Sequence, residues 1–179
     1  PVSLKQLIFA TNYQGNLTAF DMTQKRPVWN SNASSFHSPV IAKNMIMVIQ
    51  DDGSILSFSS ANLAPSWTSE EYLRRELSNG VIFNNVMLVG DLDGYVHAIN
   101  PLTGKTVGRK KATRKPIQSI VTFRDLAYII DQDSNIVAIS AGNNNYSLFL
   151  DDNGKVYGCG LNNAGQLGLG SDDTGNKYT

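Results

Sequence analysis

Four acidic turns carry oxygen atoms that could bind a calcium ion. They are Asp51-Asp52-Gly53, Asp91-Leu92-Asp93-Gly94, Asp131-Gln132-Asp133-Ser134 and Asp151-Asp152-Asn153-Gly154. A calcium loop of the common type reads Asp-x-Asp-x-Asn-Gly and continues to a glutamate at a fixed distance, which none of these turns has. Asp, Asn and Gly are also the residues that tight hairpin turns require. We therefore predict hairpin turns at these places and no metal site.

Two histidines and one cysteine are the other residues with catalytic potential. His37 and His97 have no obvious partner in the sequence, and His97 lies between apolar residues of a predicted strand, as a packed or solvent-facing residue. Cys159 has only Lys155 as a nearby base, so we expect a small packed side chain and not a nucleophile. No phosphate loop or Gly-x-Ser-x-Gly turn is present. We predict no catalytic, cofactor-binding or metal-binding residue, and no enzyme.

One dense basic cluster runs from Arg109 to Lys115, as Arg-Lys-Lys-Ala-Thr-Arg-Lys. A run of this kind is commonly a solvated connection between two structural units. It can also contact an acidic partner or lipid headgroups. Arg109, Lys110 and Lys111 are therefore the candidate partner-binding residues.

Composition limits the classes to which the protein can belong. Of 179 residues, 41% are hydrophobic and 17% are charged, which is typical of a globular chain. The formal net charge is zero, which argues against binding of nucleic acid or of an acidic membrane surface. No apolar run approaches the ~20 residues of a membrane-spanning helix. A single cysteine excludes an internal disulfide and leaves the compartment undetermined.

A repeat of about 40 residues organises most of the chain. Its copies align on Gly15, Gly53, Gly94 and Ser134, each preceded by a short apolar run and followed by alternating residues. Apolar runs joined by Asx/Gly turns are β-hairpins, and glycine suits the positive φ that such turns need. Ser134 is a weaker choice at that position.

Further strand candidates flank each hairpin. Those before a hairpin are 38–42, 77–83 and 117–123, and those after one are 28–30, 66–68 and 106–110. Four strands in about 40 residues form one blade of a β-propeller. We predict an all-β fold of β-propeller blades of four antiparallel strands, about four blades plus a fragment, as a partial ring or one completed by oligomerisation. The charged stretch 69–76 predicts a connecting turn of helix.

Trp29 and Trp67 each lie 14 residues after their turn glycine, and Gly108 takes that place in the third copy. A large aromatic side chain at a fixed phase of a repeat is expected to pack between neighbouring blades.

The strings GNLTAFDMTQKRPVW (15–29) and GYVHAINPLTGKT (94–106) resemble the repeat of pyrroloquinoline-quinone enzymes and their relatives. Within that group, ATNYQGNLTAFD, LSNGVIFNNVMLVGDLDGYVHAIN and DSNIVAIS resemble, in order, the last blades of the BamB family of outer-membrane assembly lipoproteins. The resemblance covers residues 1–140. It implies about half of an eight-bladed propeller.

Residues 141–179 resemble a different propeller repeat, that of the regulator of chromosome condensation family. The matching strings are SLFL (147–150), GKVY (154–157) and NNAGQLGLG (162–170), while Tyr146 replaces the usual His and Cys159 the usual Trp. We therefore predict two domains, 1–140 with BamB-like blades and 141–179 with a partial repeat of the second type, joined naturally or as a constructed chimera. The strand 146–150 is expected to pair with 135–140 as the outermost strand of the fourth blade, or to open the next blade.

The resemblance implies a non-catalytic scaffold without a cofactor. Such a protein would be a periplasmic, outer-membrane-associated accessory in β-barrel protein assembly that binds the central barrel subunit, with the membrane reached only through a lipid anchor or a partner outside this chain. Because open blade faces and edges invite pairing, we also expect a homo-oligomer. The alternatives are a hybrid fragment without evolved function, a quinone-dependent dehydrogenase-like enzyme, and an exchange factor or adaptor suggested by the second repeat.

Overall fold

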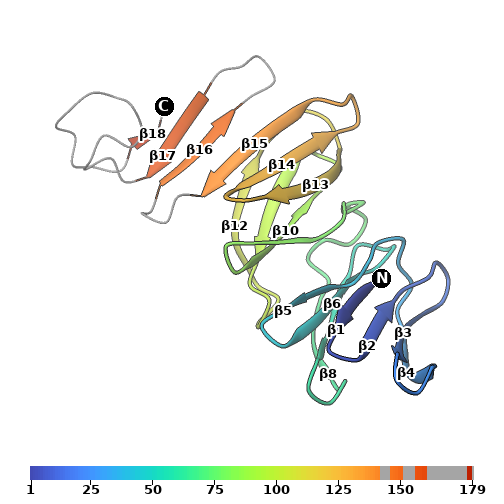
Figure 1. The fold of residues 1–179 in the computed structure, drawn as a ribbon. Helices are drawn as coiled ribbons and strands as arrows, with labels where there is room; N and C mark the ends of the chain where they lie inside the picture. The colour runs from blue at the N-terminus through green and yellow to red at the C-terminus, as the bar shows by residue number, and fades with distance from the viewer. Residues whose placement is uncertain (142–145, 151–155, 161–176, 179) are drawn as a thin grey trace.

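The computed structural model describes residues 1–141, 146–150, 156–160 and 177–178. The described residues form strands and turns without a helix, so none of them belongs to a helix that could cross a membrane. The strands make four antiparallel sheets that follow one another along the chain and fan out as successive blades (Figure 1). The all-β propeller architecture predicted from the sequence is confirmed.

Each blade adds its strands in chain order. Blade 1 contains β1 (Val2–Leu4), β2 (Leu7–Ala10), β3 (Asn16–Asp21) and β4 (Arg26–Asn32). Blade 2 contains β5 (Val40–Ala42), β6 (Met45–Ile49), β7 (Ile55–Ser59) and β8 (Pro65–Ser69). Blade 3 contains β9 (Val81–Phe83), β10 (Val86–Gly90), β11 (Tyr95–Ile99) and β12 (Thr106–Lys111). Blade 4 begins with β13 (Ile117–Phe123), β14 (Leu126–Asp131), β15 (Ile136–Ala141) and β16 (Tyr146–Leu150).

The first strand of every blade lies innermost. Strand β1 contacts β5, β5 contacts β9, and β9 contacts β13, so these four strands line the axis around which the blades are arranged. The fourth strands β4, β8 and β12 are then the outer edges. Within the described part of the chain, each of these three strands pairs with one neighbour only, so its other edge faces outward from the blade.

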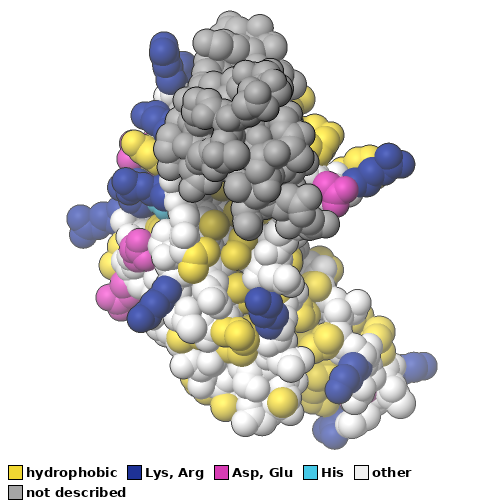
Figure 2. Space-filling model, turned by 90° about the vertical axis from the view of Figure 1, so that its left-hand side faces the viewer, with side chains coloured by type: hydrophobic (Ala, Val, Ile, Leu, Met, Phe, Trp, Pro, Cys, Tyr) yellow, Lys and Arg dark blue, Asp and Glu magenta, His cyan; other side chains and the backbone are white. Residues whose placement is uncertain are grey.

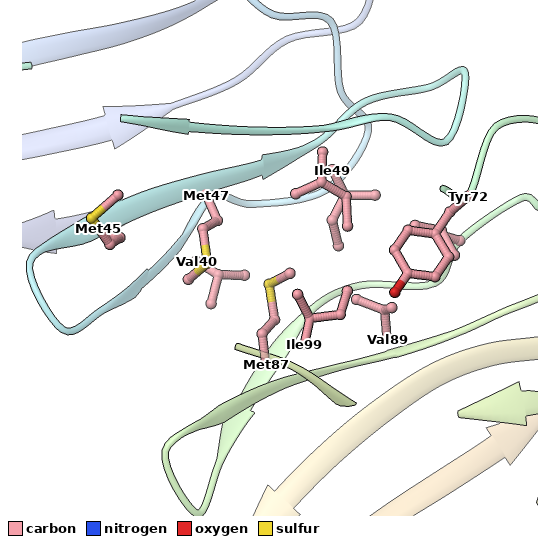
Figure 3. Packing of buried hydrophobic residues seen from close by; sticks show 10 residues of the cluster. Val40, Met45, Met47, Ile49, Tyr72, Met87, Val89 and Ile99 are labelled. Carbon is pink, nitrogen blue, oxygen red and sulfur yellow. The ribbon is translucent and has the colours of Figure 1, made fainter. Parts of the chain in front are cut away.

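Apolar faces packed between blades form the core. Between blades 2 and 3, Met47 and Ile49 of β6 oppose Met87 and Val89 of β10, and Tyr72 lies at the end of the cluster beside Ile49 and Val89 (Figure 3). All five side chains are buried. Because both faces of an inner blade are covered in this way, β6 is apolar at every position and does not alternate.

Two similar clusters lie at the other blade interfaces. Phe9, Leu17 and Phe58 belong to the cluster between blades 1 and 2. Leu88 and Ile129 belong to the cluster between blades 3 and 4. Burial of each such side chain contributes about 2 kcal/mol to stability. A separate apolar cluster thus stabilises each of the three interfaces between successive blades.

The acidic turns inside the described residues are hairpin turns, as predicted. Gly53 and Gly94 have φ of 93° and 82°, and Ser134 adopts the same left-handed region with φ of 64°. The first copy differs, because Gln14 and not Gly15 has the positive φ. A Cβ on Gly15 would instead collide with the Asn12 side chain, at 2.2 Å from its Oδ1. The turn at 151–154 lies outside the described residues.

Both tryptophans pack between blades, as predicted. Trp29 meets the Phe58 ring of blade 2 edge-on, with ring centroids 5.3 Å apart. Trp67 donates its indole N–H to the carbonyl of Pro101 in blade 3 at 3.0 Å and lies against Gly104. Each tryptophan therefore ties the outer part of its own blade to the next one.

The helix expected at 69–76 was a wrong prediction. Residues 71–75 form turns, and Arg74 and Glu76 have φ of 62° and 47°. The Arg74 N–H donates to the Asp52 carbonyl of the blade 2 hairpin turn at 2.8 Å, so it is not available for a helical bond. The tertiary contact prevails over helix propensity in this short segment. The innermost strand of blade 3 also begins later than expected, at Val81.

Connections between blades bind the hairpin turns on both sides. In the connection 112–116, the Ala112 N–H donates to the Gly94 carbonyl at 2.9 Å, and Thr113 Oγ1 donates to Asp131 at 2.6 Å. Connection and turns thus form one continuous layer at this end of the blades.

The first connection makes the same kind of link. Gln14 N–H donates to Ser34 Oγ at 2.7 Å, and Ser34 Oγ is bonded to the Asp51 carboxylate. The first connection and the connection 112–116 thus each bond to the hairpin turns of the blades on both sides, as expected for copies of one repeat.

Blade 4 is wider than the others. Strand β16 pairs antiparallel with β15, with Ser140 opposite Leu148, which confirms the pairing predicted for 146–150. Its other edge pairs with β17 (Val156–Gly160), and β18 (Lys177–Tyr178) follows, giving a sheet of six strands.

The face of blade 4 that points away from blade 3 carries exposed apolar side chains. Ile120, Ile129 and Val137 belong to the core on the blade 3 side. Their strand neighbours alternate to the other face, where Val121 and Ile136 are 50% and 55% exposed. This face is the apolar end of the stack of blades.

Candidate functional site

The predicted basic cluster is divided between the two faces of one strand. Arg109, Lys110 and Lys111 all lie in β12 and are exposed. Arg109 pairs with His97 of β11 and Lys111 pairs with Tyr95, whereas Lys110 pairs with Val96. Because successive side chains of a strand alternate, Arg109 and Lys111 share one face and Lys110 lies on the other. In Figure 2, Lys and Arg side chains likewise project from several separate places on the surface.

The Tyr95 ring holds the two cations that share its face. The Arg109 guanidinium carbon lies 4.8 Å from the ring centroid, and Lys111 Nζ lies 5.2 Å from it. Contacts of this kind contribute roughly 0.5–1 kcal/mol at exposed sites. Among the described residues neither Arg109 nor Lys111 forms an ion pair. The face therefore presents two oriented positive charges to the surroundings.

A buried ionic network lies behind this surface. Asp91, fully buried in the blade 3 turn, accepts hydrogen bonds from His97 Nε2 at 2.8 Å and from Arg75 at 2.7 Å. Its other oxygen accepts the backbone N–H groups of Asp93 and Tyr95. The carboxylate thus closes the hairpin and joins it to the connection before blade 3.

Hydrogen bonding determines the charge of Asp91. Burial alone raises the pKa of this carboxyl, but the hydrogen bonds from His97, the Tyr95 backbone and Arg75 outweigh it and hold the pKa below its usual range. Asp91 is therefore ionised at neutral pH, and it accepts its bonds as a carboxylate.

Tyr72 links the network to β12. Its ring meets the His97 ring edge-on with centroids 4.9 Å apart, and its hydroxyl is bonded to Thr106 Oγ1 at the start of β12. Thr106 in turn donates to Glu71 at 2.8 Å. Because the Thr106 hydroxyl donates its hydrogen to Glu71, the Tyr72 hydroxyl is the donor to Thr106. Burial raises the pKa of the Tyr72 phenol above its usual value. The beginning of β12 is fixed by side chains from the connection 70–76.

The Asp91–His97 pair is unsuited to catalysis. His97 is 2% exposed and Asp91 is 0% exposed, so a substrate cannot reach either group. His97 Nδ1 is buried and has no hydrogen-bond partner among the described residues. The pair therefore stabilises the hairpin, and the neighbouring face of β12 offers two cations held over an aromatic ring.

Blade 4 contains a counterpart of this network in which the side-chain donors to the carboxylate are uncharged. Asp131 stands at the position of Asp91 and accepts the N–H groups of Asp133 and Asn135, both at 3.0 Å. Its second oxygen accepts from Thr113 Oγ1 and Asn135 Nδ2. Burial raises the pKa of this carboxyl, but these bonds prevail and lower it.

Both histidines have partners that the sequence reading missed. His37 Nε2 lies 3.0 Å from the carbonyl of Leu77, and no local pattern predicts that contact between two connections. The Asp91–His97 pair could have been predicted from the sequence. The hairpin pairs Val89 with His97 and so places Asp91, two residues after Val89, on the same face as His97. Cys159 lies in β17, whose side chains are not described.

The comparisons with known proteins point to one family. A family model described as outer membrane protein assembly factor BamB matches residues 1–157, which is most of the chain and extends past residue 140. The BamB protein of Taylorella asinigenitalis is 30% identical over 146 residues, covering 80% of this chain and 38% of that protein. That of Escherichia coli K12 is 27% identical over 141 residues, covering 78% and 36%. The chain spans little more than a third of these relatives.

Solved structures agree with the sequence comparisons. BamB from Moraxella catarrhalis superposes with a TM-score of 0.72 at 25% identity, over 77% of this chain and 41% of that one. The computationally designed Ika4 protein shares the fold alone, with a TM-score of 0.68 at 13% identity over 78% of this chain and 88% of that one. From the match over residues 1–157 and the blades described above, the chain belongs to the BamB family of outer membrane protein assembly factors.

Proposed function

We propose that this chain is a non-catalytic propeller scaffold that acts as an accessory in outer-membrane protein assembly. The family match over residues 1–157, together with four blades of BamB-like architecture, carries the proposal. Two features of the described residues support it, because the Asp91–His97 pair is buried and the exposed face of β12 carries cations that a protein partner could contact. The place of action that follows is the periplasmic side of the outer membrane.

The protein partner in this proposal is the central barrel subunit of the assembly machine. In the part of the chain that the structure describes, the basic face of β12 and the apolar end of blade 4 are suited to a protein contact. Arg109, Lys110 and Lys111 remain the candidate contact residues, and attachment to the membrane would come through that partner or through a lipid anchor outside this chain.

Binding in solution tests the proposal. The chain, immobilised through a terminal tag, is exposed to the purified periplasmic domains of the barrel subunit, with an unrelated β-propeller of similar size as the control. We expect saturable binding to this chain and none to the control. Equal signals from both proteins, or none from this chain at concentrations up to about 100 μM, a weak complex by affinity scales, would reject the partner assignment.

Self-association is a further part of the proposal. The exposed apolar face of blade 4, which includes Val121, Phe123 and Ile136, would be covered by blade 1 of a second copy. Light scattering across a concentration series should then show a mass that rises from one copy to two. Val121→Glu with Ile136→Glu should abolish that rise, whereas a mass of one copy at all concentrations would contradict it.

The origin of residues 141–179 completes the proposal. We infer a partial repeat of the regulator-of-chromosome-condensation type, joined to the BamB-like blades near residue 141, because the glycine-rich string 165–170 fits that repeat. Amplification across this junction from genomic DNA of the source would yield one continuous product for a natural fusion. Failure across the junction, with success on both sides, would indicate a constructed hybrid.

A further inference from the structure

We propose that the outer edge of blade 3, strand β12, is a docking site for an extended acidic segment of another polypeptide. The segment adds to β12 as a fifth, antiparallel strand. The proposal goes beyond the assembly function and does not depend on it, because it concerns how one edge recognises its ligand and not which machine supplies that ligand.

The edge of β12 is open. Among the described strands, β12 pairs only with β11. Its residues from Val107 to Lys111 are exposed, and Val107 is 59% exposed. The outer strands of blades 1 and 2 contain Pro27 and Pro65, and proline removes a donor and blunts an edge. Strand β12 has no proline, so its edge is the most suitable of the three for pairing.

The fold already contains an added strand at the equivalent edge. In blade 4, β16 occupies the outer position, and β17 pairs antiparallel with it along five residue pairs. A fifth strand is therefore compatible with the twist of a four-stranded blade of this fold. Strand addition to an exposed edge is also a common mode of peptide recognition.

The backbone of β12 can donate and accept at this edge. The Ala112 N–H donates to the Gly94 carbonyl at 2.9 Å, directly beyond the pair Tyr95–Lys111. Because bonding alternates along an antiparallel ladder, the N–H and C=O groups of Lys111 and Arg109 point away from β11. These groups are the ones that an added strand would engage.

Charge determines which segment fits. Arg109 and Lys111 project on one face of β12 and Lys110 on the other. Side chains of an added strand alternate in the same way, so three consecutive acidic residues would meet all three cations. A second copy of this edge would place like charges opposite one another, which is unfavourable. The complementary occupant is therefore acidic and is not another β12.

Neighbouring side chains hold two of these cations, Arg109 and Lys111, in place. Tyr95 contacts both Arg109 and Lys111, and Tyr72 anchors the start of the strand through Thr106. An ordered edge loses less conformational entropy when it binds a strand. The buried network thus prepares the surface that the segment would meet.

A synthetic probe tests the inference. The fluorescent peptide Thr-Glu-Glu-Glu-Thr-Val-Thr places its three glutamates opposite Lys111, Lys110 and Arg109 in antiparallel register. Its affinity for the whole chain is measured by anisotropy. One control peptide has lysine for each glutamate, and another keeps the charges but carries N-methyl groups on alternate residues. We expect both controls to bind at least about tenfold more weakly.

Protein variants separate strand addition from a simple ionic patch. Arg109→Glu with Lys111→Glu should weaken the probe at least about tenfold, and Lys110→Glu alone about threefold. The matched control, Lys5→Glu with Lys43→Glu, reverses two exposed charges elsewhere and should change affinity less than about twofold. In wild-type protein, hydrogen exchange of the Arg109 and Lys111 amides should slow when the probe binds.

Four results would overturn the inference. They are equal affinity of the N-methylated peptide, no effect of Lys110→Glu, unchanged exchange of the two amides in the complex, and no binding of the probe below about 1 mM, the weak limit of peptide affinities. If the probe binds as expected but the barrel subunit does not, the assembly proposal fails and this inference stands.

Discussion

Blades 3 and 4 place an aspartate at the same point of their central hairpins and surround it differently. Asp91 is bound by His97 and Arg75, whereas Asp131 is bound by Thr113 and Asn135. In both turns the carboxylate accepts two backbone N–H groups. The turn therefore requires an acceptor, and each blade supplies the remaining donors from its own surroundings.

The largest effect should come from removal of the charged network. Asp91→Ala leaves His97 buried without its partner and two turn N–H groups unsatisfied, so we expect a loss of about 3 kcal/mol in the free energy of unfolding. Asp131→Ala, the matched change in blade 4, should cost about 1–2 kcal/mol, because its donors are neutral and less buried. Urea unfolding measures both, and equal costs would remove the distinction between the blades.

The second largest effect should come from Gly94, the turn glycine of blade 3, where blade 4 has Ser134. Gly94 has φ of 82°, and a Cβ there would lie 2.2 Å from the Thr113 carbonyl oxygen. Gly94→Ser should therefore cost about 2–3 kcal/mol, even though blade 4 carries serine at the equivalent position. A cost near zero by urea unfolding would mean that the connection 112–116 moves aside.

Acid should weaken both turns. Since hydrogen bonds outweigh burial, Asp91 and Asp131 have lower pKa values in the folded chain than in the unfolded one. Their contribution to stability is therefore complete above the usual Asp pKa of about 4 and is lost as the pH falls through the folded values. The urea midpoint of the wild-type protein should fall between about pH 5 and pH 2.5, and the midpoint of the Asp131→Asn variant should fall less steeply. An unchanged slope in that variant would contradict the role of Asp131.

The smallest expected effect is a gain. Ser134 has φ of 64°, a region that glycine adopts without steric cost. Ser134→Gly should raise the free energy of unfolding by about 0.5–1 kcal/mol, after the greater freedom of glycine in the unfolded chain is subtracted. Thermal melts of the two proteins check this, and a lower melting temperature would show that the serine hydroxyl contributes to the turn.

The sequence predicted the parts of the fold that are local. Gly53, Gly94 and Ser134 marked the hairpins because positive φ is a property of one residue. The packing of Trp29 and Trp67 between blades could be predicted because both lie at the same distance in sequence from their turn glycine. These features repeat, and a repeat is visible in one sequence.

Contacts made by the segments that join one blade to the next could not be predicted from the sequence. The stretch 69–76 has the residues of a helix, but Arg74 bonds to Asp52 across the blade boundary. Likewise, Arg75 meets Asp91 only after the blades stack, and so do Tyr72 with His97 and the Leu77 carbonyl with His37. The basic cluster was visible as a run, whereas its division between two faces required the register of β12.

The connection 112–116 is hydrogen-bonded to the hairpin turns of both blade 3 and blade 4, and this affects how the protein unfolds. Because Ala112 is bonded to one blade and Thr113 to the next, loosening of that segment releases two hairpins at once. Thermal opening should then spread outward from such a junction in both directions. A protease that nicks the chain there would relax both neighbours, even though every ladder inside each sheet remained intact.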